Sequence, residues 1–136
     1  MPIEYRAQIP ALADFQALFD TTGWNAEYRA TPEDLQRMLQ HSWLVLGAYD
    51  GQRLVGVGRV VSDLALHAMI YDLIVHPDFQ GRGIGGTILE QLVSACRQAA
   101  IRDIQLFSAR GKRAFYEKRG FVARPDDAPG MVYRPS

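Results

Sequence analysis

A short glycine-rich stretch, Gln80–Gly86, most strongly limits what this chain can fold into. It holds four of the twelve glycines and lies between an apolar segment, Ala68–Val75, and a segment whose apolar residues recur at helical spacing. Glycine adopts positive φ and lets the backbone approach a ligand, while the start of a helix presents N–H groups that have no intrahelical partner. The stretch therefore predicts a strand, a tight turn and a helix, with an anion-binding site to which Arg82 adds a charge. A strand-to-helix turn that binds nothing is the alternative interpretation.

The length and charge of the chain limit the class of protein. Its 136 residues predict a single domain, 1–136. With 15 Lys and Arg against 15 Asp and Glu, the chain lacks the basic field that attracts long nucleic acid or an anionic membrane, so we expect neither partner. No apolar stretch approaches the roughly 20 residues of a membrane helix. The single cysteine, Cys96, and an N-terminus without a leader pattern predict a cytoplasmic protein.

The spacing of apolar residues predicts strands and helices along the whole chain. Strands are expected at Ile3–Ile9, Trp43–Tyr49, Leu54–Val61, Ala68–Val75, Ile104–Phe107, Phe121–Ala123 and Met131–Tyr133. Helices are expected at Leu12–Asp20, Pro32–Gln40 and Lys112–Lys118 and after the glycine-rich turn, with a loop over Trp24–Ala30. Asp50-Gly51 predicts a two-residue hairpin turn, so the strands beside it are expected to pair antiparallel. The strand–helix–strand unit around the glycine-rich turn makes its two strands parallel.

The glycine spacing Gly81-x-Gly83-x-x-Gly86 also matches the fingerprint of dinucleotide-binding proteins. That fingerprint requires an acidic residue at the end of the following strand, about twenty residues further on, to hold a ribose. Asp103 precedes that strand instead of ending it, which disfavours a nicotinamide cofactor. A nucleoside-triphosphate P-loop is disfavoured too, because Thr87 follows the glycines with no lysine between.

The segment Gln80-Gly81-Arg82-Gly83-Ile84-Gly85 resembles the Q/R-x-x-G-x-G/A element of the GNAT superfamily of N-acetyltransferases. Val75–Phe79 before it and Phe115–Phe121 near the C-terminus resemble the neighbouring blocks of that family, and the resemblance covers essentially the whole chain. It implies an α/β (α+β) fold with a mixed, mostly antiparallel sheet and about four helices. It also implies that two central parallel strands splay apart, with acetyl-CoA between them.

The resemblance implies which residues bind the cofactor. Backbone amides of the glycine-rich turn hold the pyrophosphate of CoA, the preceding strand pairs with the pantetheine arm, and an N–H near Leu73 faces the thioester oxygen. The implied cofactor-binding residues are Leu73, Ile74, Val75, Gln80, Gly81, Arg82, Gly83, Ile84, Gly85, Gly86 and Tyr116. Tyr116 is also implied to be the general acid that protonates the departing thiolate. The structural alternative is that Tyr116 only packs between Phe115 and Phe121. Ala109 stands where many relatives carry an asparagine that touches the pantetheine, so that contact is not implied.

The general base is harder to assign, because Met69 occupies the position of the glutamate that serves the histone-acetylating branch. Asp72 is the nearest carboxylate, and Tyr71-Asp72 resembles an aromatic–Asp pair in relatives that acetylate small arylalkylamines. We expect Asp72 to act as the base or amine anchor, with an ion pair to Arg59 as the structural alternative. Strict strand alternation places Tyr71 and Asp72 on opposite faces, and a bulge would change that assignment.

The resemblance makes a primary amine on a small molecule the favoured acceptor, with Trp24, Arg59 and Tyr71 as candidate substrate-binding residues. An amine of a protein or peptide is the second candidate, and a non-catalytic acyl-CoA-binding module is the third. Three histidines and one cysteine without ligand spacing predict no metal site. A homodimer through the C-terminal strands is also implied, since many relatives form one.

Overall fold

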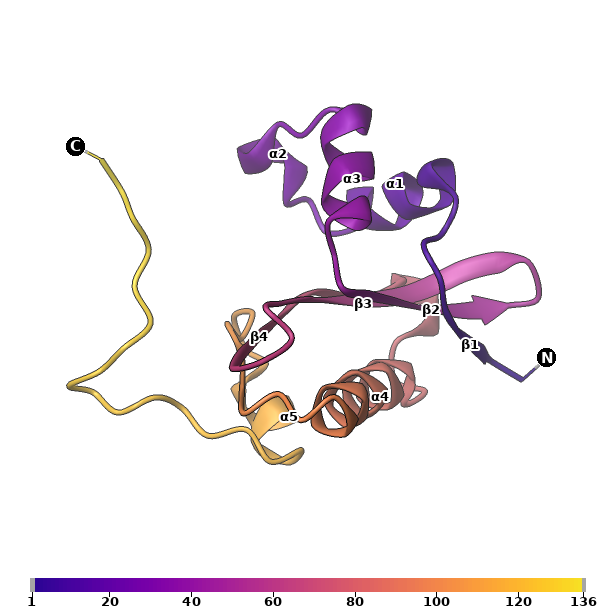
Figure 1. The fold of residues 1–136 in the computed structure, drawn as a ribbon. Coiled ribbons are helices and arrows are strands. Elements are labelled where there is room, and N and C mark those ends of the chain that lie inside the picture. Colours follow the sequence, from indigo (N-terminus) through magenta and orange to yellow (C-terminus); the bar gives the residue numbers. More distant parts are fainter. Residues whose placement is uncertain (1, 136) are drawn as a thin grey trace. The chain divides into compact units, whose positions relative to one another are not determined.

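The computed structural model describes residues 2–135, and the chain divides after Leu106 into two compact units. The first unit contains a five-stranded sheet with helices on both of its faces (Figure 1). The second unit begins at Phe107 and contains one short helix. The mixed α/β architecture confirms the predicted fold class, and the described residues form five α-helices where about four were expected.

Two amphipathic helices cover one face of the sheet. α1, Leu12–Asp20, and α3, Pro32–Gln40, have the predicted bounds. A capping box begins α3: the Thr31 hydroxyl accepts from the Asp34 N–H, and the Asp34 carboxylate accepts from the Thr31 N–H. Pro32 sits at the first helical position, where no N–H is needed. The two helices bury Phe15, Leu18, Phe19, Leu35 and Leu39 in a core that also contains residues of the sheet.

The segment Trp24–Ala30, predicted as a loop, contains a single helical turn, α2, Asn25–Tyr28. The Asn25 side chain accepts from the Ala30 N–H (2.7 Å) and donates to the Ala30 carbonyl (3.2 Å). Arg29 is left-handed, with a φ of 51°, and ends the turn. One turn is too short for apolar periodicity to indicate it, so local hydrogen bonding decides this element.

The strands of the sheet lie in chain order. They are β1 Glu4–Ala7, β2 Leu44–Asp50, β3 Arg53–Ser62, β4 His67–Val75 and β5 Asp103–Leu106. The first four pair antiparallel and β4 pairs with β5 in parallel, which confirms the predicted crossover. The parallel pairing includes only His67–Ile70 of β4. Within the first unit, the rest of β4 therefore has no strand partner on that edge.

α4, Ile84–Gln98, covers the opposite face of the sheet (Figure 1). Glycines in β3 allow it to approach closely. A Cβ added at Gly58 would lie 2.8 Å from Leu92 Cδ1 and 2.9 Å from Ile88 Cγ2, and one at Gly56 would lie 3.0 Å from Ile88 Cδ1. Because Gly56 and Gly58 have no side chains, α4 packs directly against the backbone of β3. This close packing positions the N-terminus of α4 near the end of β4.

We expect Gly58→Ala to lower the free energy of unfolding by about 1–3 kcal/mol, because the added methyl group overpacks the interface between β3 and α4. Urea unfolding measures this loss. Leu92→Ala makes room for the methyl group, so the double variant should lose less stability than the sum of the two single variants. Strictly additive losses would contradict this description of the packing.

The second unit contains α5, Arg113–Glu117, followed by an extended C-terminal segment. Gly120 has a φ of 92°, which confirms the predicted left-handed residue after the helix. The strands predicted at Phe121–Ala123 and Met131–Tyr133 are wrong, because the described residues of this unit contain no strand. A strand requires a hydrogen-bonded neighbour, and the side-chain pattern of a segment does not supply one.

Candidate functional site

The glycine-rich turn connects η1, Pro77–Phe79, at the end of β4 to the start of α4. Gly81 and Gly83 both have a φ of 80°, which glycine adopts without strain. Gly83 is the N-cap of α4, and Gly85 and Gly86 lie in its first turn, where the amides lack intrahelical partners. A Cβ at Gly81 or Gly83 would meet no atom within 4 Å, so the space beside the turn is open. This backbone fits a pyrophosphate or a similar anion.

The side chains of the turn divide into two groups. Gln80 donates from Nε2 to the Val75 carbonyl (3.0 Å) and so ties the turn to β4. Ile84 is 2% exposed and anchors α4 in the core. Arg82 is exposed, and its guanidinium carbon lies 4.9 Å from the Phe79 ring centroid. Gln80 and Ile84 therefore shape the turn, while Arg82 and the backbone amides are available to a ligand.

The unpaired edge of β4 leads directly to this turn. Leu73, Ile74 and Val75 lie on that edge, beyond the pairing with β5 that stops at Ile70. The Ile74 side chain is 4% exposed and belongs to the core. The main-chain groups of this stretch that neither pair with β3 nor bind Gln80 are open to a ligand, and they suit an extended, amide-containing molecule.

A β-bulge in β4 changes which face its side chains occupy. Asp72 has a φ of 54°, and the register with β3 shifts between Val57 and Arg59. The expectation from strict alternation, with Tyr71 and Asp72 on opposite faces, is wrong because the bulge inserts one extra residue. Both side chains instead contact Arg59.

Arg59 joins β3, β4 and the loop before β2. Its Nε donates to Asp72 Oδ2 (2.7 Å), and its Nη1 donates to Ser42 Oγ (3.2 Å). Its guanidinium carbon lies 5.2 Å from the Tyr71 ring centroid. The Arg59 and Asp72 side chains are only 13% and 15% exposed, so little solvent screens the ion pair. Sequence reasoning missed Ser42, because a contact across 17 residues leaves no local pattern.

Trp24 packs back on the core of the first unit. Its ring lies edge-to-face with that of Phe19, with centroids 6.2 Å apart, and it borders the hydrophobic cluster beneath α1 and α3. This packing accounts for the large aromatic without a ligand. The expected contact between Trp24 and an acceptor stays a prediction, whereas Arg59, Tyr71 and Asp72 do lie together.

Tyr116 lies on α5 in the second unit, between two aromatic rings. Its ring meets Phe115 at 5.1 Å and Phe121 at 6.1 Å, edge-to-face in both cases. Burial raises the pKa of the Tyr116 phenol from its ordinary value of about 10. The phenol is therefore protonated at neutral pH, which is the state that a general acid requires.

Among residues 2–135, no group of three or more His, Cys, Asp or Glu side chains gathers to hold a metal ion. Cys96 is buried in α4, and burial raises the pKa of its thiol, which disfavours a nucleophilic thiolate. None of the helices in the described part of the chain is long and apolar enough to cross a membrane.

The glycine-rich turn at the start of α4 follows a strand whose parallel pairing with β5 ends at Ile70. The chain belongs to the GNAT acetyltransferase family, because the family's acetyltransferase (GNAT) domain matches residues 17–129. The protein is therefore an acyltransferase.

Curated relatives carry acetyltransferase names, several of them N-acetyltransferase names. An uncharacterised N-acetyltransferase, ycf52, of Porphyra purpurea is 35% identical over 128 residues, which covers 91% of this chain and 72% of the relative. Histone acetyltransferase TAP1 of Glycine max is 33% identical and is matched over 90% of this chain and 57% of its own length. Serotonin N-acetyltransferase 2, chloroplastic, of Oryza sativa subsp. japonica is 33% identical, with 77% of this chain and 54% of the relative covered.

Solved structures share the fold. A probable acetyltransferase, SA2161, of meticillin-resistant Staphylococcus aureus has a TM-score of 0.85 at 25% identity, covering 98% of this chain and all of its own. The PaiA N-acetyltransferase of Thermoplasma acidophilum, solved in complex with coenzyme A, has a TM-score of 0.71 at 21% identity, with 91% and 92% covered. These likenesses confirm the fold predicted from the sequence motifs.

Proposed function

We propose that this chain transfers an acetyl group from acetyl-CoA directly to a primary amine of a small molecule. The observation that carries the proposal is the continuity between the unpaired edge of β4 and the glycine-rich turn. CoA has the matching form, with a peptide-like arm that leads to a pyrophosphate. The family match at residues 17–129 spans both units, which supports a single N-acetyltransferase domain over residues 1–136.

When bound, acetyl-CoA supplies an activated acetyl thioester. In this proposal the backbone amides of Gly81–Gly86 hold the pyrophosphate, Arg82 adds its charge beside the phosphate groups of CoA, and Leu73, Ile74 and Val75 bind the pantetheine arm through their main chain. An N–H near Leu73 stabilises the charge that develops on the acetyl oxygen, an effect commonly worth ~3–4 kcal/mol per donor. The open space beside the turn supports this arrangement.

Tyr116 and Asp72 are the two side chains that transfer or bind protons in the proposed reaction. Tyr116 gives its phenol proton to the departing thiolate, which its raised pKa supports. Asp72 binds the ammonium of the acceptor or takes its proton. Arg59 holds Asp72 at Oδ2, and within residues 2–135 the other oxygen, Oδ1, receives no hydrogen bond. Asp72 is thus fixed in position and keeps one oxygen for an amine.

The small-molecule acceptor is supported by the Tyr71 ring beside Asp72, since an aromatic surface next to a carboxylate suits an amine with an apolar body. The relative named a serotonin N-acetyltransferase is consistent with this class. A protein or peptide amine is the second candidate, and the relative named a histone acetyltransferase favours it. Ala109, in place of a pantetheine-binding asparagine, favours a non-catalytic acyl-CoA-binding module.

A cytoplasmic location and a homodimer stay predictions. The single cysteine supports a reducing compartment. The rice relative, serotonin N-acetyltransferase 2, is named as a chloroplastic protein.

The function is tested by incubating the protein with acetyl-CoA and a panel of amines while the free thiol of CoA is measured. The panel contains arylalkylamines, aliphatic amines and amino acids, together with a lysine-containing peptide. Turnover with a small amine supports the proposal, and turnover with the peptide alone overturns the acceptor class. Tight CoA binding without any turnover favours the non-catalytic module.

We expect Asp72→Asn to lower kcat/KM for the best amine about tenfold to a hundredfold, because an amide neither accepts a proton nor pairs with an ammonium. Affinity for CoA should not change. Unpairing Arg59 also destabilises the fold, so the double variant Arg59→Gln/Asp72→Asn is the control: it recovers thermal stability while activity stays low. Wild-type kcat/KM in Asp72→Asn would exclude any role of this carboxylate toward the amine.

A further inference from the structure

Two arginines from separate elements approach one buried aromatic ring beside the glycine-rich turn. Phe79 ends η1 and is 7% exposed. The guanidinium carbon of Arg82 lies 4.9 Å from the ring centroid, and that of Arg53, the first residue of β3, lies 5.3 Å from the same point. Contacts of this kind hold a guanidinium by its attraction to the ring face and leave N–H groups at its edge for a ligand.

The start of β3 and the end of β4 lie at the same end of the sheet, which explains how Arg53 reaches the turn. Gly56 pairs with Val75 in the register, and the His76 N–H donates to the Val55 carbonyl (2.8 Å). Arg53 Nη2 also lies 3.3 Å from His76 Nε2. Arg53 therefore stands beside the segment that leads from β4 into the proposed pyrophosphate site.

Neither arginine is held in an ion pair by a nearby acid of the described residues, although Asp50 lies opposite Arg53 in the register of β2 and β3. Asp78, the acid within this segment, is 73% exposed and lies 3.8 Å from His76 instead. Both guanidinium carbons lie within 5.3 Å of one ring centroid, so a phosphate dianion that contacts both groups would gain charge-assisted hydrogen bonds from each.

We propose that Arg53 and Arg82 form a second phosphate-binding point beside the glycine-rich turn and bind the 3′-phosphate monoester of CoA. This inference rests on the proposed use of acetyl-CoA. CoA carries that monoester in addition to its pyrophosphate, and the amides of the turn are occupied by the pyrophosphate in the proposed complex. Arg53 is thereby a cofactor-specificity residue that no glycine motif includes, and Phe79 positions it.

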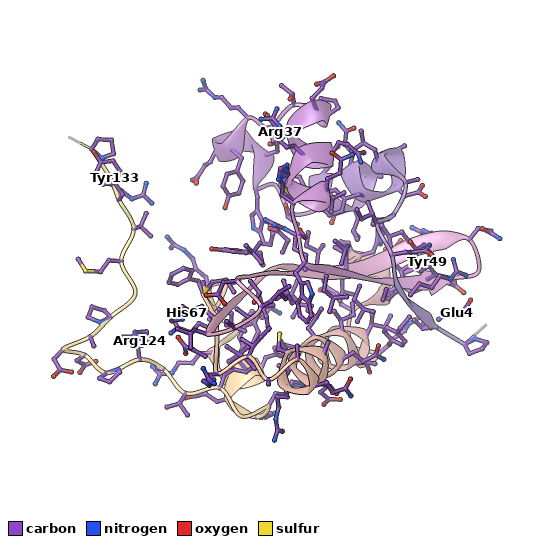
Figure 2. All side chains as sticks on the ribbon, viewed as in Figure 1. Glu4, Arg37, Tyr49, His67, Arg124 and Tyr133 are labelled. Atoms are coloured by element: carbon purple, nitrogen blue, oxygen red, sulfur yellow. The ribbon has the colours of Figure 1, made fainter. Side chains whose placement is uncertain are left out.

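The test compares the affinities of CoA and 3′-dephospho-CoA by isothermal titration calorimetry. We expect the wild type to prefer CoA, and Arg53→Gln to weaken CoA binding about tenfold while the affinity for 3′-dephospho-CoA stays unchanged. Arg53→Lys keeps the charge but loses the planar fork and should fall between the two. The matched control is Arg37→Gln, which removes a 66% exposed arginine from α3 in the helical layer (Figure 2) and should change neither affinity.

The outcomes separate this inference from the proposed function. If Arg53→Gln weakens both ligands equally, or neither, Arg53 does not recognise the 3′-phosphate and the inference is overturned while CoA binding stands. If the wild type binds neither ligand, the proposed cofactor itself is wrong and the inference falls with it. A loss of thermal stability in Arg53→Gln with both affinities unchanged would assign Arg53 a purely structural contact with Phe79.

Discussion

Gly83→Val is expected to weaken CoA binding by about a hundredfold or more, because several charge-assisted hydrogen bonds to backbone amides are lost together. Gly83 has a φ of 80°, a conformation in which a β-branched residue is strained. Its Cβ position faces open space, which the phosphate groups occupy in the proposed complex. Isothermal titration with CoA measures the effect.

Gly23→Val is the matched control for this substitution. Gly23 also has a positive φ, 75°, and a Cβ there meets no atom within 4 Å, so the local strain is similar. Gly23 lies between α1 and α2, remote in sequence from the turn. The control should lose stability and retain CoA affinity. Equal CoA affinity in the wild type and Gly83→Val would show that the turn is not the phosphate site.

Tyr116→Phe is expected to lower kcat by about a hundredfold or more, since general acid catalysis commonly contributes 10²–10⁴. Phenylalanine keeps the packing against Phe115 and Phe121 and removes only the proton donor. CoA affinity should therefore change little. Single-turnover measurement of CoA release isolates the chemical step from product release.

The pH dependence gives a second readout for Tyr116. Burial raises the pKa of the phenol, so the acid stays protonated up to pH values above about 10. The wild-type rate should rise as the amine loses its proton and should not fall until the pH exceeds that value. Tyr28→Phe, which alters a tyrosine that is 71% exposed, serves as the control and should leave the profile unchanged. A single-turnover rate in Tyr116→Phe equal to that of the wild type would remove Tyr116 from the chemistry.

Local patterns predicted the elements that lie around the site. The bounds of α1 and α3 were predicted without error, and β4 begins one residue earlier than expected, at His67. Capping residues, proline at the first turn and apolar spacing act within a few residues, so a single segment carries them. The glycines of the turn are equally local, since each conformation depends on one residue.

The geometry of the cluster formed by Arg59, Asp72 and Ser42 was not predictable from the sequence. The Asp72 bulge depends on how β4 aligns with β3, and Ser42 reaches Arg59 only after the sheet has formed. Arg53 and Phe79 meet in the same way, across strands and a turn. The prediction of two C-terminal strands was wrong for a related reason: a strand needs a hydrogen-bonded partner, which its own sequence does not contain.

The sequence by itself determined the α/β order of the elements, the glycine-rich turn and the membership of the GNAT family, because all of these reside in short contiguous motifs. Only the tertiary structure decided that the parallel pairing stops at Ile70, that Asp72 pairs with Arg59, and that Arg53 joins Arg82 at Phe79. The physical reason is that hydrogen bonds and charge contacts between distant segments depend on strand register and helix packing. These are properties of the folded chain as a whole.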